Sequence, residues 1–370
     1  MAGQDRLAQL ALNFIPGIGH MLVKQLVSYC GSAEAVFKTP KSKLLKIPGI
    51  GAFTADSISK DIPMKRAEVE LNKCDKEGVQ ILLHTDKAFP KRLNHINDAP
   101  SLLYYKGAAD LNSNKIVSIV GTRKATAYGK EITEHIIEHL APHNPVIVSG
   151  LAYGIDIHAH KSALKHNLST IGVLASGVNV IYPAIHRDTA NKMIEHGALI
   201  SENPLDAKPD APKFPARNRI IAGMADAIVV VEAAAKGGAL ITAEIANSYN
   251  KDVFAVPGNV NSEFSLGCNN LIRSNKAHLI NSGKDIEYIM NWEANNPEAG
   301  NKLPDLSELN EDELTIVNAL VEHVDGMMID NLSWKTSLSV SQLASILLNL
   351  EFKGLVISLP GKKFKLAINK

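Results

Sequence analysis

The sequence predicts an α/β protein built on a doubly wound parallel sheet, and three observations support this prediction. Short apolar runs rich in Val and Ile alternate with helical patterns through the middle of the chain, and the joints between them are short. Glycine and serine follow several of these runs, as expected where a ligand approaches the carboxyl ends of parallel strands. The 370 residues also exceed the usual size of one hydrophobic core, so we expect further domains beside the sheet.

The first segment, residues 1–65, contains a near-repeat that predicts two helical hairpins. Phe14 to Gly19 has the sequence FIPGIG, Ile47 to Gly51 has the sequence IPGIG, and a helical pattern follows each. This pattern resembles the tandem helix-hairpin-helix motifs of SAM-like domains. The backbone N–H groups of such turns hold a DNA phosphate without reading its base, but similar pairs also serve as packing or dimerisation modules. Both roles remain open.

The next two segments are a predicted connector, residues 66–110, and the predicted sheet domain, residues 111–293. The connector has one helical pattern and two apolar runs, at 79–83 and 102–105. The strands of the sheet share a high content of β-branched residues. They are expected at 116–120, 146–149, 170–174, 198–201, 227–231, 253–256 and 278–280.

A polar linker, residues 294–305, precedes the last predicted domain, residues 306–370. Helical patterns at 314–324, 329–335 and 340–353 come before two short strands at 356–359 and 364–368. This order is typical of a winged helix. The third helix has no Arg or Lys before Lys353, so we do not expect sequence-specific duplex binding. We expect partner docking or weak DNA contact, with Lys362 and Lys363 on the wing as the best DNA-binding candidates.

Composition and charge favour an ordinary protein of the cytoplasm. Apolar residues make up 45% and charged residues 21% of the chain, and no apolar run approaches the roughly 18 residues that would predict a membrane span. The three cysteines do not form a metal-ligand pair. The net charge of +1 conceals an uneven distribution: residues 1–110 have 15 basic and 11 acidic residues, whereas residues 294–370 have 7 and 10. Any basic surface is therefore local.

The stretch from Lys213 to Glu244 predicts a phosphate-binding face. Arg217 and Arg219 come just before a buried strand, and the pair Gly237 and Gly238 then opens a helix expected at 239–249. Glycines can take backbone angles that other residues avoid, and a helix N-terminus presents free N–H groups to an anion. Arginines add forked donors for phosphate oxygens. The alternative is a set of solvated surface charges beside an ordinary turn.

Other kinds of site have weaker support, and we expect no metal, cofactor or catalytic residue. Gly121 is followed by TRKATAYG, which fits neither the dinucleotide fingerprint nor a phosphate loop of nucleotide hydrolases. Asp156, His158 and His160 are two positions apart, so a helix would not place them on one face. Glu202 and Glu232 end two strands and could act as acid and base. They could equally cap helices or hold Arg217 and Arg219.

The motifs of the central segment, taken in order, resemble one known family. GTRKATAYG, SGLAYGIDIHAH, LASGVNVIYP, SENP, FPARNRIIAGMADAIVVVEA, GGALITAEIA, FAVPG and GCNNLI look like the DNA-processing protein A family, also called Smf or DprA, over roughly residues 84–290. The resemblance implies a Rossmann-like domain that forms a homodimer and binds single-stranded DNA in a basic pocket. It also implies a non-enzymatic role in natural transformation, in which the protein protects incoming strands and helps load the recombinase RecA.

The resemblance also implies which residues bind DNA. Backbone donors and arginines would hold phosphates, and Phe214 would offer a face on which a base can stack. Tyr153 stands where the family commonly has a basic residue. Motif by motif, the implied site comprises Gly121, Arg123, Ser149, Gly150, Lys213, Phe214, Arg217, Asn218, Arg219, Gly237, Gly238 and Asn269.

A second function stays open, because similar sheets with a Gly-Gly helix start also serve phosphoribohydrolases that cleave nucleoside monophosphates. The corresponding loop in those enzymes resembles Pro-Gly-Gly-x-Gly-Thr followed by a glutamate. The stretch from Lys236 to Glu244 instead places Leu240 and Ile241 in the reactive part of the loop. The motif therefore favours DNA binding over hydrolysis.

Overall fold

The chain divides into two compact units, residues 1–294 and 295–370. The computed structural model describes residues 2–60, 62–292, 309–321, 323, 326–359 and 361–366. The linker predicted at 294–305 lies outside the described residues, and the predicted boundaries within the first unit stay predictions. Among the described residues, no helix combines the length and apolar character that crossing a bilayer requires.

Within the described part of the first unit, nine strands form one sheet, and this confirms the predicted fold class. Each of the seven strands expected in the sheet domain is present, with ends within one residue of the prediction. The two apolar runs of the connector also form strands. The strands are β1 Gln80–Leu83, β2 Leu102–Gly107, β3 Ile116–Val120, β4 Val146–Ser149, β5 Thr170–Val173, β6 Ala198–Ser201, β7 Ala227–Val230, β8 Asp252–Ala255 and β9 His278–Leu279.

The strand order makes the sheet doubly wound. The order is β1-β2-β6-β5-β4-β3-β7-β8-β9. All strands that stand between β6 and β9 in this order, including β3, β4 and β5, are parallel to one another. The chain runs outward from β3 to β6 and then returns to the other side of β3 with β7. Strands β2 and β1 extend the β6 edge in antiparallel pairing. The order therefore reverses between β3 and β7, which is where such sheets bind ligands.

Helices cover both faces of the sheet, because alternate residues of each strand point to opposite sides. Val117 and Ile119 of β3 pack with α8, α9 and α14, while Ile116 and Val120 pack with α11, α12 and α13. The covering helices are α7 Lys91–Asn94, α8 Ala127–Leu140, α9 Ile155–Lys165, α10 Arg187–His196, α11 Lys213–Met224, α12 Gly238–Ser248, α13 Leu266–Arg273 and α14 Gly283–Ile289.

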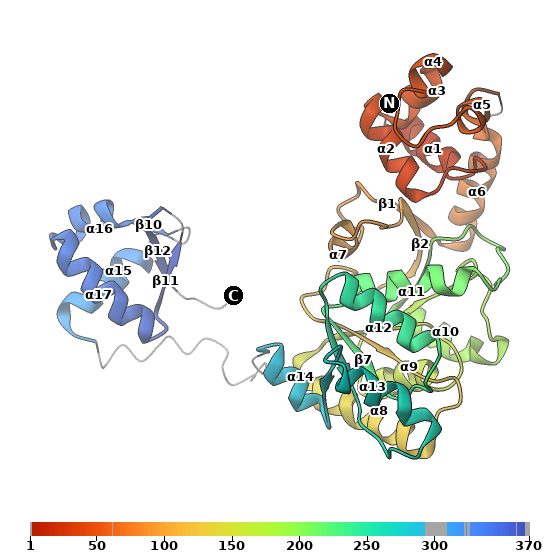
Figure 1. Ribbon diagram of the computed structural model, residues 1–370. Helices are drawn as coiled ribbons and strands as arrows, with labels where there is room; N and C mark the ends of the chain where they lie inside the picture. The colour runs from red at the N-terminus through yellow and green to blue at the C-terminus, as the bar shows by residue number, and fades with distance from the viewer. Residues whose placement is uncertain are drawn as a thin grey trace. The chain divides into compact units, whose positions relative to one another are not determined.

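The N-terminal helices lie together at one end of the unit, beyond β1 and β2 (Figure 1). The predicted near-repeat forms two turns of the same geometry: Gly17 and Gly49 have φ angles of 81° and 80°. In each turn the N–H of the next residue, Ile18 or Ile50, donates to the carbonyl three residues earlier. These helices are α1 Ala2–Leu12, α2 His20–Cys30, α3 Ala33–Lys38, α4 Lys41–Leu44, α5 Ala52–Lys60 and α6 Met64–Glu77.

A shared core and polar bonds join these helices to the edge of the sheet. Leu10 of α1 and Cys74 of α6 pack with Tyr104 of β2. Arg6 donates to the carbonyl of Ile81 in β1 at 2.8 Å and pairs with Asp86 at 2.7 Å. The outer edge of β1 is thereby partly covered, which limits its pairing with another chain.

The second unit has the predicted winged-helix fold. Three helices precede a hairpin, and a short strand that the sequence did not predict completes an antiparallel sheet of order β10-β12-β11. With two residues, β10 is too short to give an alternating pattern. The elements are α15 Glu311–Val321, β10 Met327–Met328, α16 Ile329–Thr336, α17 Val340–Phe352, β11 Val356–Leu359 and β12 Lys363–Leu366.

Substitution of Gly107, at the end of β2, can test how closely the antiparallel strand β2 packs against β6 of the parallel sheet. Its φ angle is 145°, and a Cβ there would overlap the carbonyl oxygen of Gly197 and lie 2.6 Å from the Cα of Ala198. We expect Gly107→Ala to lower the free energy of unfolding by about 2 kcal/mol or more, measured by urea unfolding. Gly78→Ala is the control, since Gly78 also has a positive φ but has open space around it. It should cost about 1 kcal/mol. Equal losses would contradict the predicted overlap.

Candidate nucleic-acid interface

A pocket of about 290 Å³ lies where the strand order reverses. We call it the switch-point pocket. The loops after β3 and β7 and the helices α11 and α12 supply most of its lining, and the loop after β4 and α9 supply Ala152 and Asp156. Its polar and glycine lining comprises Gly121, Thr122, Arg123, Asp156, Arg217, Asn218, Lys236, Gly237, Gly238 and Thr242.

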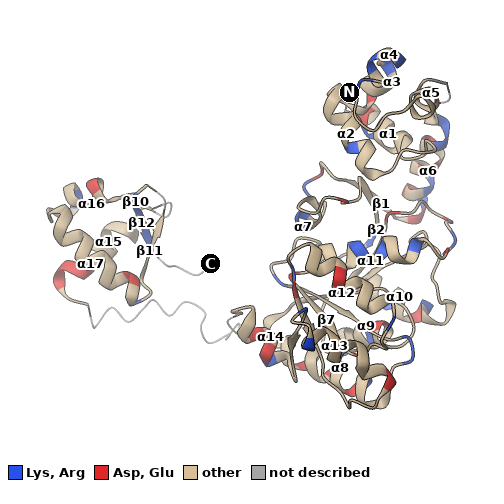
Figure 2. Cartoon of the chain, viewed as in Figure 1, with Lys and Arg blue, Asp and Glu red and all other residues tan. Residues whose placement is uncertain are grey.

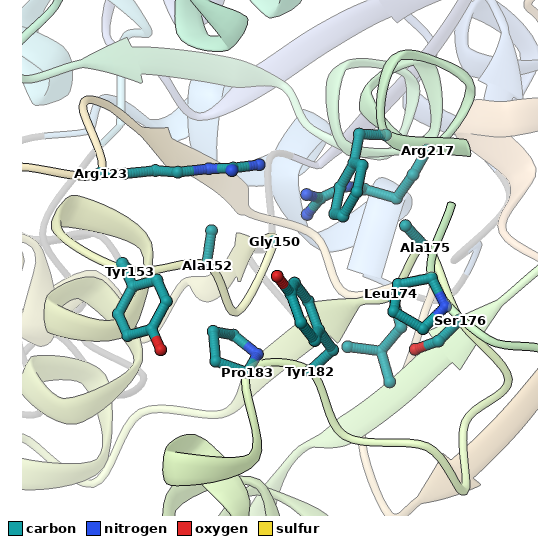
Figure 3. Close-up of a pocket in the computed structure, with 12 residues that line it drawn as sticks. Arg123, Gly150, Ala152, Tyr153, Leu174, Ala175, Ser176, Tyr182, Pro183 and Arg217 are labelled. Carbon is teal, nitrogen blue, oxygen red and sulfur yellow. The ribbon is translucent and has the colours of Figure 1, made fainter. Parts of the chain in front are cut away.

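A smaller cavity of about 50 Å³, the aromatic pocket, adjoins the switch-point pocket, and the two share Arg123, Phe214 and Arg217. Figure 3 shows Arg123 and Arg217 extending toward each other near Gly150, with Tyr182 on the opposite side of the pocket. The guanidinium of Arg123 lies 5.3 Å from the centre of the Phe214 ring. The rings of Phe214 and Tyr182 are 6.3 Å apart. This is a cluster of cations and aromatic faces.

Arg217 is the buried member of this cluster. It is 5% exposed, its Nη1 donates to the carbonyl of Val173 at 3.1 Å, and its buried Nε has no hydrogen-bond partner within the described part of the chain. Burial lowers the pKa of Arg217, and the charge of Asp156 opposes this effect. Arg217 has an unsatisfied Nε and lines both pockets. Its guanidinium could therefore bind an anion from the floor of the pockets.

Asp156 is the buried acidic residue beside Arg217. Its carboxylate accepts the N–H groups of Gly150 at 3.2 Å and Ala152 at 3.4 Å. Burial raises the pKa of Asp156, while the charge of Arg217 and these hydrogen bonds oppose the rise. The sequence predicted Asp156 only as a helix residue. It does lie in α9, but its carboxylate also holds the loop after β4 and balances the arginine.

The glycines of the site have different roles. A Cβ on Gly150 would overlap Arg217 Nη1, so Gly150 leaves room for the guanidinium. Gly237 has φ 169° and ψ 168°, an extended conformation open to any residue, and a Cβ there would meet no atom within 4 Å. The expectation that the Gly237–Gly238 pair takes unusual backbone angles is therefore wrong for Gly237. The small residues instead leave the N-terminus of α12 uncovered beside the pocket.

Glu202 and Glu232 have structural partners. This agrees with the prediction that they cap helices or hold arginines. Glu232 accepts the N–H of Thr126 at 3.0 Å and its hydroxyl at 2.6 Å, next to the start of α8. Glu202 pairs with Arg219 and with Nε2 of His20, the latter at 2.9 Å. Burial alone would raise the pKa of Glu202, but the hydrogen bond from His20 and the charge of Arg219 lower it below its ordinary value.

The structure brings eight of the twelve predicted site residues together around the two pockets. Each lines at least one pocket, either with its side chain or, for the glycines, with its backbone. These eight are Gly121, Arg123, Gly150, Phe214, Arg217, Asn218, Gly237 and Gly238.

The other four predicted residues are outside the described lining, and each has a different partner. The Ser149 hydroxyl is buried and donates to the carbonyl of Ile119 at 2.6 Å. Lys213 donates to the carbonyl of Lys208. Arg219 pairs with Glu202, and the Asn269 side chain bonds to both the N–H and the carbonyl of Gly258. Spacing along α11 explains why Arg219 does not line the pockets with Arg217. A side chain two residues further along a helix leaves it in a different direction.

The sequence reasoning missed Tyr182 and Lys236 as lining residues. Tyr182 lies in the LASGVNVIYP motif and Lys236 immediately precedes the glycine pair, so both were within recognised stretches. Figure 2 shows where Lys and Arg gather, including a group along α11. On α11, however, Arg217 is buried and Arg219 is paired with Glu202, so the exposed cations of the described pocket lining are Arg123 and Lys236.

Comparison with known families identifies the chain. The model of the family described as DNA recombination-mediator protein A matches residues 80–291, more than half of the sequence. The chain belongs to this family. A second model, described as the DprA winged helix domain, matches residues 301–362. Among curated relatives, the protein Smf of Synechocystis sp. is 36% identical over 290 residues, which cover 77% of this chain and 73% of that protein.

Two solved structures of the family resemble this fold. DNA processing protein A from Streptococcus pneumoniae matches with a TM-score of 0.66 and 31% identity, covering 77% of this chain and 96% of the other. The structure of DNA processing protein A from Helicobacter pylori, solved to examine its mode of single-stranded DNA binding, matches with a TM-score of 0.52 and 30% identity. It covers 57% of this chain and 95% of the other. The family's members are thus DNA-processing proteins.

The balance between Asp156 and Arg217 can be tested by stability. We expect Asp156→Asn to lower the free energy of unfolding by about 3 kcal/mol, because it leaves a buried guanidinium without an opposing charge. Adding Arg217→Met should restore much of the loss, and urea unfolding of the single and double variants measures both effects. Asp188→Asn is the control, since Asp188 also lies in the first turn of a helix but is exposed. Similar small losses for both single variants would contradict the predicted balance.

Proposed function

We propose that the chain binds single-stranded DNA along the switch-point and aromatic pockets without catalysing a reaction. The observation that carries this proposal is the direct junction of a pocket lined by cations and glycine backbone with an aromatic pocket, through Arg123, Phe214 and Arg217. A nucleotide strand presents the same two chemistries side by side, a phosphate and a base. Single-strand binders hold the first with cations and backbone donors and the second by stacking.

Each part of the strand has a matching group. Arg123, Asn218, Lys236 and the N-terminus of α12 suit phosphate oxygens, and Phe214 with Tyr182 suits a base face. Because every base has a stacking face, this arrangement would accept any sequence. A protein that receives strands of arbitrary sequence needs such tolerance. The single-stranded DNA binding examined in the Helicobacter pylori relative supports the same assignment.

We propose the family's wider role for this chain on the same basis. The protein would protect single-stranded DNA in the cytoplasm during natural transformation and help load RecA onto it. It would act as a homodimer formed through the Rossmann-like domain. The family description as a recombination mediator supports this assignment.

The partners of the carboxylates near the site favour binding of nucleic acid over hydrolysis of a nucleotide. Glu202 and Glu232 already hold neighbouring residues. Glu244, the carboxylate that a phosphoribohydrolase reading would use, pairs with Lys276 at 2.7 Å on the surface. These pairings support a site that holds nucleic acid and leaves its covalent bonds unchanged.

Arg123 offers the sharpest test of the proposed function, because it is exposed and lines both pockets. We expect Arg123→Glu to weaken binding of oligothymidylate about ten-fold or more at low salt, measured by fluorescence anisotropy. The slope of log affinity against log salt should fall by about 0.7, the value for one lost phosphate contact on a single strand.

Arg273→Glu is the matched control for Arg123→Glu. Arg273 is an exposed arginine at the end of α13, where it donates to Asn270. The control reverses the same charge and should change affinity little. Unchanged affinity for Arg123→Glu, or an equal loss for both variants, would overturn the proposed site.

A further inference from the structure

A groove of about 1100 Å³ lies between the first N-terminal hairpin, α5 and the start of α6, and we call it the hairpin groove. The first hairpin contributes Phe14 and Pro16, α5 contributes Phe53, and the start of α6 contributes Lys65 and Arg66. Its volume is several times the 290 Å³ of the switch-point pocket. A space of this size can accept several units of a polymer.

The hairpin groove presents aromatic side chains beside cations. The guanidinium of Arg66 lies 4.3 Å from the centre of the Phe14 ring. Phe53 is 70% exposed, yet its ring is close to the first turn, because a Cβ on Gly17 would lie 3.6 Å from it. An exposed phenyl ring beside a packed turn is a ready surface for stacking.

The charges around the hairpin groove suit a polyanion. Lys65 and Arg66 are both exposed at its rim. The acidic residue of the lining, Asp56, is paired with Lys41 at 2.7 Å, so its charge is largely balanced. Residues 1–110 have four more basic than acidic residues. An acidic peptide would meet the cations too, but it would leave the exposed Phe53 ring and the half-buried Phe14 ring without partners as well suited as bases.

The hairpin groove continues toward the pockets of the sheet. A second hollow of about 340 Å³ shares Phe14, Pro16 and Arg66 with it and reaches Pro204, in the loop between β6 and α11. The same loop supplies Pro209 to the aromatic pocket. The two hollows thus connect the hairpin groove to the loop that borders the aromatic pocket.

We infer that the hairpin groove is a second contact site for the same DNA strand that fills the switch-point and aromatic pockets. Bases stack on Phe53 and Phe14, and Lys65 contacts a phosphate. The inference rests on the proposed function, since it extends the bound strand beyond the sheet. The strand crosses the loop between β6 and α11 to reach the groove.

The test uses oligothymidylates of two lengths with the full chain. An oligomer of about 5 nucleotides occupies the pockets of the sheet, whereas one of about 30 nucleotides also reaches the hairpin groove. We expect Phe53→Ala to weaken binding of the long oligomer about five-fold or more, with a much smaller loss for the short one. Phe53→Tyr keeps a stacking face and should retain long-oligomer affinity. Fluorescence anisotropy measures all of these affinities.

Met21→Ala is the matched control for Phe53→Ala. Met21 occupies the corresponding position after the first hairpin turn and is 60% exposed, so its truncation should leave both affinities unchanged. Lys65→Gln provides a second measurement that does not depend on Phe53. It should lower the salt slope for the long oligomer by about 0.7.

Two results separate this inference from the proposed function. If Arg123→Glu weakens both oligomers while Phe53→Ala and Lys65→Gln change neither, the second contact is wrong and the pocket site stands. If Arg123→Glu also changes neither, the proposed function itself fails. A selective loss with the long oligomer in Phe53→Ala, with Met21→Ala unchanged, supports the second contact. Circular dichroism of each variant confirms that the fold is intact.

Discussion

The buried guanidinium of Arg217 and the carboxylate of Asp156 beside it set the constraint on which the binding site depends. A buried charge is costly unless an opposite charge and hydrogen bonds compensate it. Asp156 supplies the charge, and the carbonyl of Val173 supplies an acceptor. Gly150 leaves the space. Residues from β5, α9, α11 and the loop after β4 are thereby fixed against one another at the floor of both pockets.

The doubly wound strand order determines where Arg217 and Asp156 form the floor of a binding site. Because the chain reverses between β3 and β7, the loops after these strands diverge and leave a hollow between them. The start of α12 and the exposed Arg123 then border the same hollow. A protein with a net charge of +1 can in this way concentrate cations at one place without being basic overall.

Glu202 joins the N-terminal hairpins to the sheet. Its carboxylate pairs with His20 of α2 and with Arg219 of α11. Arg219 had been expected to bind DNA, and its residue type and neighbourhood gave good grounds for that expectation. In the structure, Arg219 pairs with Glu202 and lies outside the described lining of the two pockets. These two pairs of Glu202 join elements of the same compact unit, which contains both the hairpin groove and the pockets of the sheet.

The sequence by itself determined the sheet, the winged helix, the repeated turns and several residues of the pocket lining, because these depend on local periodicity, glycine turns and motifs a few residues long. It also led to the family. Only the tertiary structure decided that Arg217 is buried against Asp156, that Arg219 pairs with Glu202, and that Asn269 holds Gly258. The physical reason is that side chains close together in the sequence leave a helix in different directions. Their partners come from strands and helices that are distant in the chain, and no local pattern records those contacts.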